Sequence, residues 1–193
     1  MTVKFVLLLI LILSSCTNTH IKTELREPLP ISIINKEYSL NDCNRNILTD
    51  ELIDKISIYK SSRNMYLYKN AKIIYKFKIS LGKNPKGHKL KQGDFKTPIG
   101  KYTITLKRCD KKYYRAIYIS YPDSEDLTRG AKSGVNVGSG ITIHSQPTWN
   151  ADGKGDEYTL SRDWTQGCIA ITTADMQILW SRLKIATPIE IRE

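Results

Sequence analysis

The sequence lacks several features that would each have narrowed the function at once. After residue 13, no apolar run is long enough to span a bilayer as a helix. No segment repeats at a fixed spacing, and no second linker interrupts the chain. His20, His88 and His144 stand apart without a nearby second ligand, so the spacing of a zinc site is absent. No nucleic-acid-binding motif is present either, and we expect no nucleic-acid partner.

Negative charge is also scarce, because 30 lysines and arginines face 19 acidic residues and give a formal net charge of +11. An excess of positive charge favours attraction to an acidic polymer or to an anionic lipid surface. The alternative is that lysines keep an exported protein soluble. The lysines are scattered apart from a denser stretch at residues 83–96, so composition leaves both interpretations open.

The first 16 residues resemble the signal peptide of a bacterial lipoprotein. Lys4 precedes an apolar run at residues 5–13, which is too short to span a bilayer and suits a signal-peptide core. Residues 13–16 (Leu-Ser-Ser-Cys) resemble a lipobox, which implies cleavage before Cys16 and lipid attachment to it. An ordinary secretory signal that ends near a cysteine is the alternative. We expect an exported lipoprotein, anchored to the periplasmic face of a membrane by its lipid and not threaded through the bilayer.

Composition divides the rest of the chain into a tether and one domain. Residues 16–46 are rich in Thr, Asn, Lys, Glu and Pro, with one short apolar patch at residues 31–34. Such a segment buries too little surface to fold alone, so we expect a spacer. A first strand packed on the main domain is the alternative. Residues 47–193 are long enough for a single domain with its own core, and we expect a monomer.

Cysteine is scarce, and each of the four residues needs an assignment. Cys16 is assigned to lipid, and Cys168 to the chemistry described below. Cys43 and Cys109 remain. In an oxidising compartment these two can pair and fasten the tether to the domain. Two free, partly buried thiols are the alternative, and the sequence does not decide between them.

Short alternating runs predict a mainly β domain with helices packed on it. We expect strands at residues 55–58, 101–107, 114–120, 141–144, 168–172 and 189–191, and a hairpin at 66–79. A capping-type start at residues 172–175 predicts a helix. Its apolar face has helical spacing and consists of Met176, Leu179, Trp180 and Leu183. A second helix is expected from residue 123 to about residue 132, ended by Gly134.

Residues 163–170 (Asp-Trp-Thr-Gln-Gly-Cys-Ile-Ala) contain the parts of an activated nucleophile. Cys168 is the candidate, because the thiolate is the reactive form of cysteine and a histidine can generate it. Gly167 lets the backbone bend, and we expect it to leave the amides of Gly167 and Cys168 free to face an oxyanion. His144 is the candidate base, with an unperturbed pKa near 6.5. A buried structural cysteine and a core histidine are the alternatives.

Several stretches together resemble the catalytic domain of the L,D-transpeptidases of bacterial cell walls. These are residues 80–82 (Ser-Leu-Gly), 93–102 (Gly-Asp-Phe-Lys-Thr-Pro-Ile-Gly-Lys-Tyr), 120–122 (Ser-Tyr-Pro), 143–144 (Ile-His) and 165–169 (Thr-Gln-Gly-Cys-Ile). The resemblance covers about residues 55–191, and the Asp-Trp-Thr-x-Gly-Cys-Ile-Ala form is similar to one subgroup. It implies a β-sandwich or barrel domain in which the backbone carbonyl of Ser145 orients the imidazole of His144.

The resemblance also implies a reaction on peptidoglycan stem peptides. The Cys168 thiolate attacks the bond between the L-centre of the third stem residue and a terminal D-alanine, and an amine resolves the thioester. We expect no metal and no cofactor. The chain departs from the common family pattern, because Gln166 replaces a histidine and Ala170 replaces a polar residue. These departures leave the nucleophile and the base in place but put the acceptor in doubt.

Three alternatives therefore accompany acyl transfer. Water as the acceptor would make the protein a carboxypeptidase, or a hydrolase that cuts a protein from the wall. A catalytically idle wall-binding lipoprotein is an alternative of another class. A papain-like protease fits less well, because its catalytic cysteine precedes its histidine in the chain and here the order is reversed.

Residues beside the nucleophile are candidates for substrate contact. Thr165 could donate a hydrogen bond to substrate and Gln166 could line the acyl pocket, although either could cap its own turn. Trp164 could be a platform for a sugar or a stem peptide, although aromatic residues more often pack. Arg162 and Arg115 could hold a substrate carboxylate through bidentate contacts. His88 is the rival base, but its Gly/Lys/Pro-rich surroundings favour a solvated loop.

Overall fold

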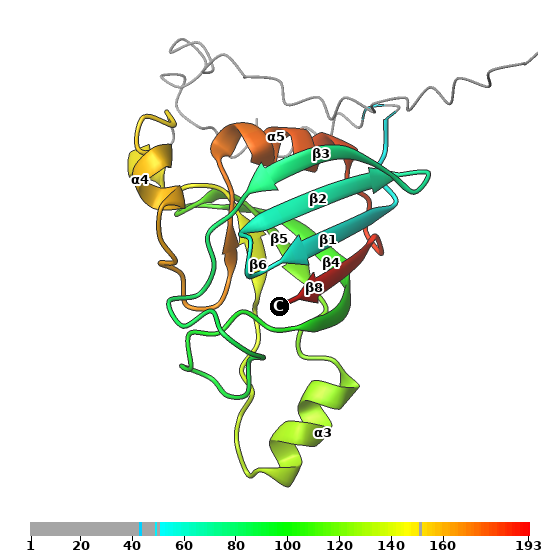
Figure 1. The fold of residues 1–193 in the computed structure, drawn as a ribbon, viewed down its shortest axis with the longest axis vertical. Coiled ribbons are helices and arrows are strands. Elements are labelled where there is room, and N and C mark those ends of the chain that lie inside the picture. Colours follow the sequence, from blue (N-terminus) through cyan, green and yellow to red (C-terminus); the bar gives the residue numbers. More distant parts are fainter. Residues whose placement is uncertain (1–42, 44–48, 50, 151) are drawn as a thin grey trace, which may run out of the picture.

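The computed structural model describes residues 43, 49, 51–150 and 152–193 (Figure 1). The proposed signal peptide, Cys16 and almost all of the tether lie outside these residues. Within the described part, no helix is both long and apolar enough to cross a membrane.

Eight strands form one mixed sheet that curves into a half-barrel, in the order β3-β2-β1-β8-β4-β5-β6-β7 (Figure 1). Two neighbouring pairs, β1 with β8 and β6 with β7, are parallel, and the other pairs are antiparallel. The mainly β fold expected from the sequence is confirmed. The strands are β1 (Lys55–Tyr59), β2 (Asn64–Lys69), β3 (Lys72–Lys78), β4 (Gly100–Asp110), β5 (Tyr114–Ile119), β6 (Thr142–His144), β7 (Ile169–Ala170) and β8 (Pro188–Arg192).

Both predicted helices are present, as α3 (Ser124–Lys132) and α5 (Thr173–Arg182). The start of α3 has a capping box between Asp123 and Asp126, and Thr172 caps α5 by accepting a hydrogen bond from the Asp175 N–H. Two further short helices were not expected, the 3₁₀ helix η1 (Thr148–Asn150) and α4 (Asp156–Leu160). Figure 1 shows α5 lying over the sheet, whereas α3 extends away from it.

The core lies between the concave face of the sheet and α5. Alternate strand residues supply it, so that Ile56 and Ile58 of β1 are fully buried. The apolar stripe of α5 faces the same core with Met176, Leu179 and Trp180. The period-2 and helical patterns in the sequence therefore meet in one continuous core, and this core supports the two short strands that carry the candidate site.

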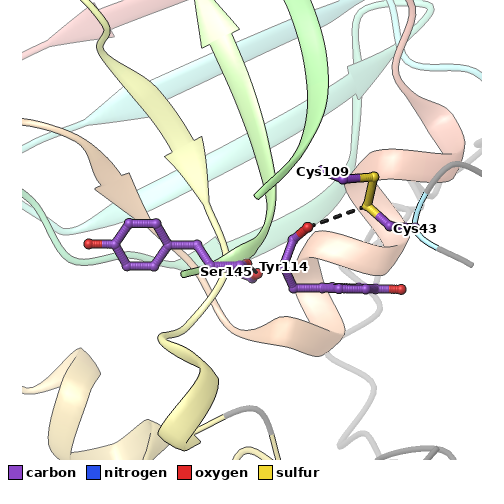
Figure 2. Close-up of a disulfide and its surroundings, with 5 residues drawn as sticks. Cys43, Cys109, Tyr114 and Ser145 are labelled. Carbon is purple, nitrogen blue, oxygen red and sulfur yellow. Dashed lines mark hydrogen bonds between the residues drawn. A yellow bond between two sulfur atoms is a disulfide. The ribbon is translucent and has the colours of Figure 1, made fainter. Parts of the chain in front are cut away.

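A disulfide joins Cys43 to Cys109, near the end of β4, with the two Cα atoms 5.9 Å apart (Figure 2). Figure 2 shows Tyr114 beside it, and the carbonyl of Tyr114 lies 3.3 Å from the Cys43 sulfur. Of the two alternatives that the sequence left open, the structure shows the paired form. The cross-link closes a sequence separation of 66 residues and fixes one point of the preceding chain to the domain.

We predict that removing this cross-link destabilises the domain. Replacing Cys43 and Cys109 together with serine should lower the free energy of unfolding by about 2–4 kcal/mol, because a disulfide restricts the unfolded chain. Urea denaturation with and without dithiothreitol measures the effect. Cys168→Ser is the matched control, since it removes a thiol and leaves the disulfide intact, so reductant should still destabilise it. Equal stability of the native protein in both conditions would contradict the prediction.

Candidate active site

The parallel pairing of β6 and β7 brings the two predicted catalytic residues together. Ile143 pairs with Ile169 and His144 pairs with Ala170. Because Cys168 directly precedes Ile169, it lies beside Thr142, and the two side chains share a face of the sheet. His144 is two residues after Thr142 and lies on that same face. Ile143 and Ile169 point the other way and are fully buried in the core.

The turn before Cys168 requires a glycine. Gly167 has a φ of +124°, and a Cβ placed there would lie 2.7 Å from the carbonyl oxygen of Lys96. Any side chain would therefore collide with the neighbouring backbone as well as strain its own. This close approach packs the turn against residues 95–97. It thereby fixes the position of Cys168, which directly follows Gly167.

Thr165 holds this turn from within. Its hydroxyl accepts a hydrogen bond from the Gly167 N–H at 3.1 Å and donates to the carbonyl of Cys168 at 2.7 Å. Thr165 thus caps its own turn, which was the alternative to substrate contact. The expectation that the Gly167 amide is free for an oxyanion is wrong for the same reason. In the described chain, the N–H of Cys168 has no protein acceptor, so this amide is the one available to an oxyanion.

Asp163 anchors the same segment to distant parts of the chain. Its carboxylate pairs with Arg63, with 2.6 Å between Nη2 and Oδ2, and accepts the N–H of Leu81 at 2.9 Å. Sequence reasoning missed this role, because Arg63 lies 100 positions earlier in a turn and no local pattern links the two residues.

The imidazole of His144 is held in its neutral form. Its Nδ1 lies 2.8 Å from the carbonyl of Ser145. A carbonyl can only accept, so Nδ1 carries the proton and Nε2 has a free lone pair. The ring of Tyr113 stacks on the imidazole at 4.0 Å between centroids, and Trp164 meets it edge-on at 5.6 Å. Burial lowers the pKa of His144 from 6.5 to about 4, so the imidazole is uncharged at neutral pH.

The sulfur of Cys168 lies on a partly exposed residue with two polar neighbours. The hydroxyl oxygen of Thr142 is 3.5 Å from Sγ, and the carbonyl oxygen of Gly140 is 3.9 Å from it. Neither neighbour nor the stacking residue Tyr113 was identified from the sequence. Thr142 alternates with isoleucines and looks like an ordinary strand residue, and Tyr113 lies in a turn 31 residues before His144.

Two cavities meet at Cys168, and Gln166 and Cys168 line both of them. The first, of about 660 Å³, contains the imidazole of His144 with Tyr113, Trp164 and Thr165. Three cationic residues, Lys83, Lys112 and Arg162, also line it. The second cavity, of about 700 Å³, is lined mainly by residues of 89–95 and 136–141.

One wall of the second cavity is organised by Asp94. Its carboxylate pairs with Lys89 at 2.8 Å and accepts the backbone N–H groups of Leu90, Lys91 and Lys96. Burial opposes ionisation of Asp94, but these hydrogen bonds outweigh it and lower the pKa from 3.8 to about 2. The loop therefore keeps a permanently charged centre at neutral pH.

Of the other residues that the sequence suggested for substrate contact, two line the first cavity and one is packed in the interior. Arg162 and Trp164 line the first cavity, and the guanidinium of Arg162 lies over the ring of Tyr158 at 3.8 Å. Arg115 is 8% exposed and packs between the rings of Tyr114 and Trp180. The suggestion that Arg115 holds a substrate carboxylate is therefore wrong.

His88, the rival base, has a structural position. Its Nδ1 accepts the N–H of Ile99 at 3.0 Å, and its Nε2 pairs with Asp126 at 2.9 Å. It lines neither of the two cavities at Cys168. His88 lies in a loop, as expected, but both ring nitrogens have protein partners, so the expectation that it is solvated is wrong.

A family model described as the L,D-transpeptidase catalytic domain, YkuD, matches residues 53–191. The putative L,D-transpeptidase YafK of Escherichia coli K12 is 33% identical over 81 residues, which cover 39% of this chain and 33% of the relative. The chain thus spans about a third of the length of this curated relative.

Among solved structures, the helical cell shape determining protein Pgp2 of Campylobacter jejuni is 25% identical. Its match covers 83% of this chain and 56% of that protein, with a TM-score of 0.55. Bd1075 of Bdellovibrio bacteriovorus is 24% identical over 74% of this chain and 49% of its own, with a TM-score of 0.50, and shows the shared fold.

We predict that His144 titrates near pH 4 and not near 6.5. Because its folded pKa lies below the unfolded value, the unfolded chain binds more protons between these two pH values. The contribution of His144 to the free energy of unfolding should therefore fall as pH falls from 6.5 towards 4. NMR of histidine-labelled protein measures the titration. His144→Gln identifies the signal and should remove this contribution from the stability profile. A midpoint at 6.5 would contradict burial as the cause.

Proposed function

Because the chain belongs to the YkuD family of L,D-transpeptidase catalytic domains, we propose that it transfers acyl groups of peptidoglycan stem peptides through a thioester on Cys168. The observation that carries this proposal is the parallel register of β6 and β7. It sets Cys168 and a neutral His144 on one face and in one cavity. A neutral imidazole can accept the thiol proton, which is the first requirement of nucleophilic catalysis.

In the proposed reaction, Nε2 of His144 takes the proton from the Cys168 thiol. The thiolate attacks the carbonyl carbon of the third stem residue, and the Cys168 N–H faces the oxyanion that forms. As the C–N bond breaks, the imidazolium returns its proton to the departing amine of D-alanine. The carbonyl of Ser145 holds the ring throughout, because it accepts the Nδ1 proton.

The first cavity is the proposed site of the departing amine. The general acid must reach the leaving nitrogen, and His144 lines this cavity. A departing D-alanine carries a carboxylate, and Arg162, Lys83 and Lys112 line the same cavity with positive charge. The acyl part of the stem then extends into the second cavity, with Gln166 between the two. The acceptor enters where the amine left, since the same base must deprotonate it.

Acceptor identity decides between transfer and hydrolysis, because both begin from the same thioester. An amine acceptor regenerates an amide and links two stems. Water gives a shortened stem, or a released protein when the bond cut was a link between the wall and a protein. The replacement of the common histidine by Gln166 beside the nucleophile makes this choice the main question for the experiment.

We predict that purified protein changes the masses of isolated peptidoglycan fragments and that Cys168→Ala abolishes the change. Mass spectrometry of the fragments distinguishes the products. New cross-linked species indicate transfer, and stems shortened by D-alanine or a released protein indicate hydrolysis. Unchanged melting and circular dichroism control for folding of the variant. Unaltered fragments with the native protein would contradict catalysis and favour an idle wall-binding lipoprotein.

We further propose that the protein is exported and anchored by lipid on Cys16, and this proposal rests on the sequence alone. Cys16→Ala should move the protein from the membrane fraction to the soluble periplasmic fraction and abolish labelling by a palmitate analogue. A high-salt wash controls for electrostatic adsorption of a chain with a net charge of +11. Membrane association that survives both the substitution and the wash would overturn the lipid anchor.

A further inference from the structure

Thr142 makes a contact with the nucleophile that the reaction above does not use. Its hydroxyl oxygen lies 3.5 Å from the sulfur of Cys168, and the residue is 7% exposed. Nowhere in the described chain does this hydroxyl have a second hydrogen-bond partner. Burial keeps bulk water from competing for it, so the sulfur is the group that satisfies the hydroxyl.

The direction of this hydrogen bond follows from the other neighbour of the sulfur. The carbonyl of Gly140, 3.9 Å from Sγ, can only accept, so it is the neighbour towards which the S–H of a thiol points. A threonine hydroxyl rotates to suit its surroundings and can donate to the sulfur. When the thiol loses its proton, the carbonyl has no proton left to accept, whereas the hydroxyl donates to a charged atom. Hydrogen bonds to charged atoms are the stronger kind.

We propose that Thr142 is a catalytic residue whose hydroxyl donates a hydrogen bond to the Cys168 thiolate and stabilises it. The proton of the thiol passes to Nε2 of His144, and the negative charge left on Sγ is shared with the Thr142 O–H. The proposal deepens the proposed function by adding a third group at the reacting atom. Its effect on the thiol can nevertheless be measured without any wall substrate.

The strand holds the hydroxyl in place for this role. Thr142 pairs with Tyr118 of β5 on one side of β6, and Cys168 lies on the other side, before β7. A β-branched side chain in a strand has restricted χ1 freedom, so the hydroxyl loses little entropy in holding this position. Valine has the same branched shape and no donor. The contribution of the hydroxyl can therefore be separated from that of packing.

The test is the pH dependence of Cys168 alkylation by iodoacetamide in the full-length protein, followed by mass spectrometry of the peptide that contains Cys168. Thr142→Val should raise the midpoint of this profile by about one pH unit. That shift makes alkylation about tenfold slower below the midpoint, equivalent to ~1.4 kcal/mol. Thr142→Ser, which keeps the hydroxyl, should move the midpoint by less than half as much. Thr105→Val, an exposed threonine on β4, is the matched control and should not move it.

Two results would overturn the proposal. One is an unchanged midpoint in Thr142→Val, and the other is an equal shift in the serine and valine variants, which would assign the effect to packing. The wall-fragment assay keeps this outcome separate from the proposed function. If Thr142→Val shifts the alkylation profile but the native protein leaves wall fragments unaltered, only the proposed acyl transfer is contradicted. If Thr142→Val leaves the alkylation profile unshifted but the native protein alters wall fragments, only the role of Thr142 is contradicted.

Discussion

The parallel pairing of β6 with β7 is the constraint on which the candidate site depends. Both strands are short, and their register is fixed by Ile143 and Ile169, which face the core without exposure to solvent. Side chains alternate between the two faces of a strand, so a slip of one residue would turn Cys168 into the core. The hydrophobic effect that buries two isoleucines thereby also aims the sulfur and the imidazole at the same space.

Cys168 is further held by groups that come from far apart in the chain. Asp163 ties its turn to Arg63 and Leu81, and Gly167 allows the turn to approach the backbone of Lys96. Buried polar groups carry a cost unless they are paired. In the described chain the indole N–H of Trp164 and the N–H of Cys168 have no protein partner. The Asp163 carboxylate, the Gly167 N–H and the Cys168 carbonyl are hydrogen-bonded. The site is thus rigid where the sulfur is held, whereas its two cavities remain open for substrate.

Local patterns in the sequence predicted the strands and the two longer helices, and they named Cys168 and His144 as candidates, whereas η1 and α4 were not predicted. Alternation gave the strands, and a capping start with an apolar stripe gave α5. Contacts between distant segments could not be read in this way. The stacking of Tyr113 on His144 depends on where the β4–β5 turn lies, and the engagement of the Gly167 amide depends on the rotamer of Thr165. Arg115 looked available for substrate because its packing against Trp180 has no local signal.

The position of Gln166 and Cys168 between two cavities has a consequence for how specificity can evolve. A change at residue 166 alters the wall of both compartments at once, so a substitution that improves the fit of one partner also perturbs the other. Independent adaptation is open only to residues that belong to a single compartment, such as Trp149 on one side and Phe95 on the other. Differences among related chains should therefore concentrate at residues that line a single cavity. Residue 166 should change only together with residues of both cavities.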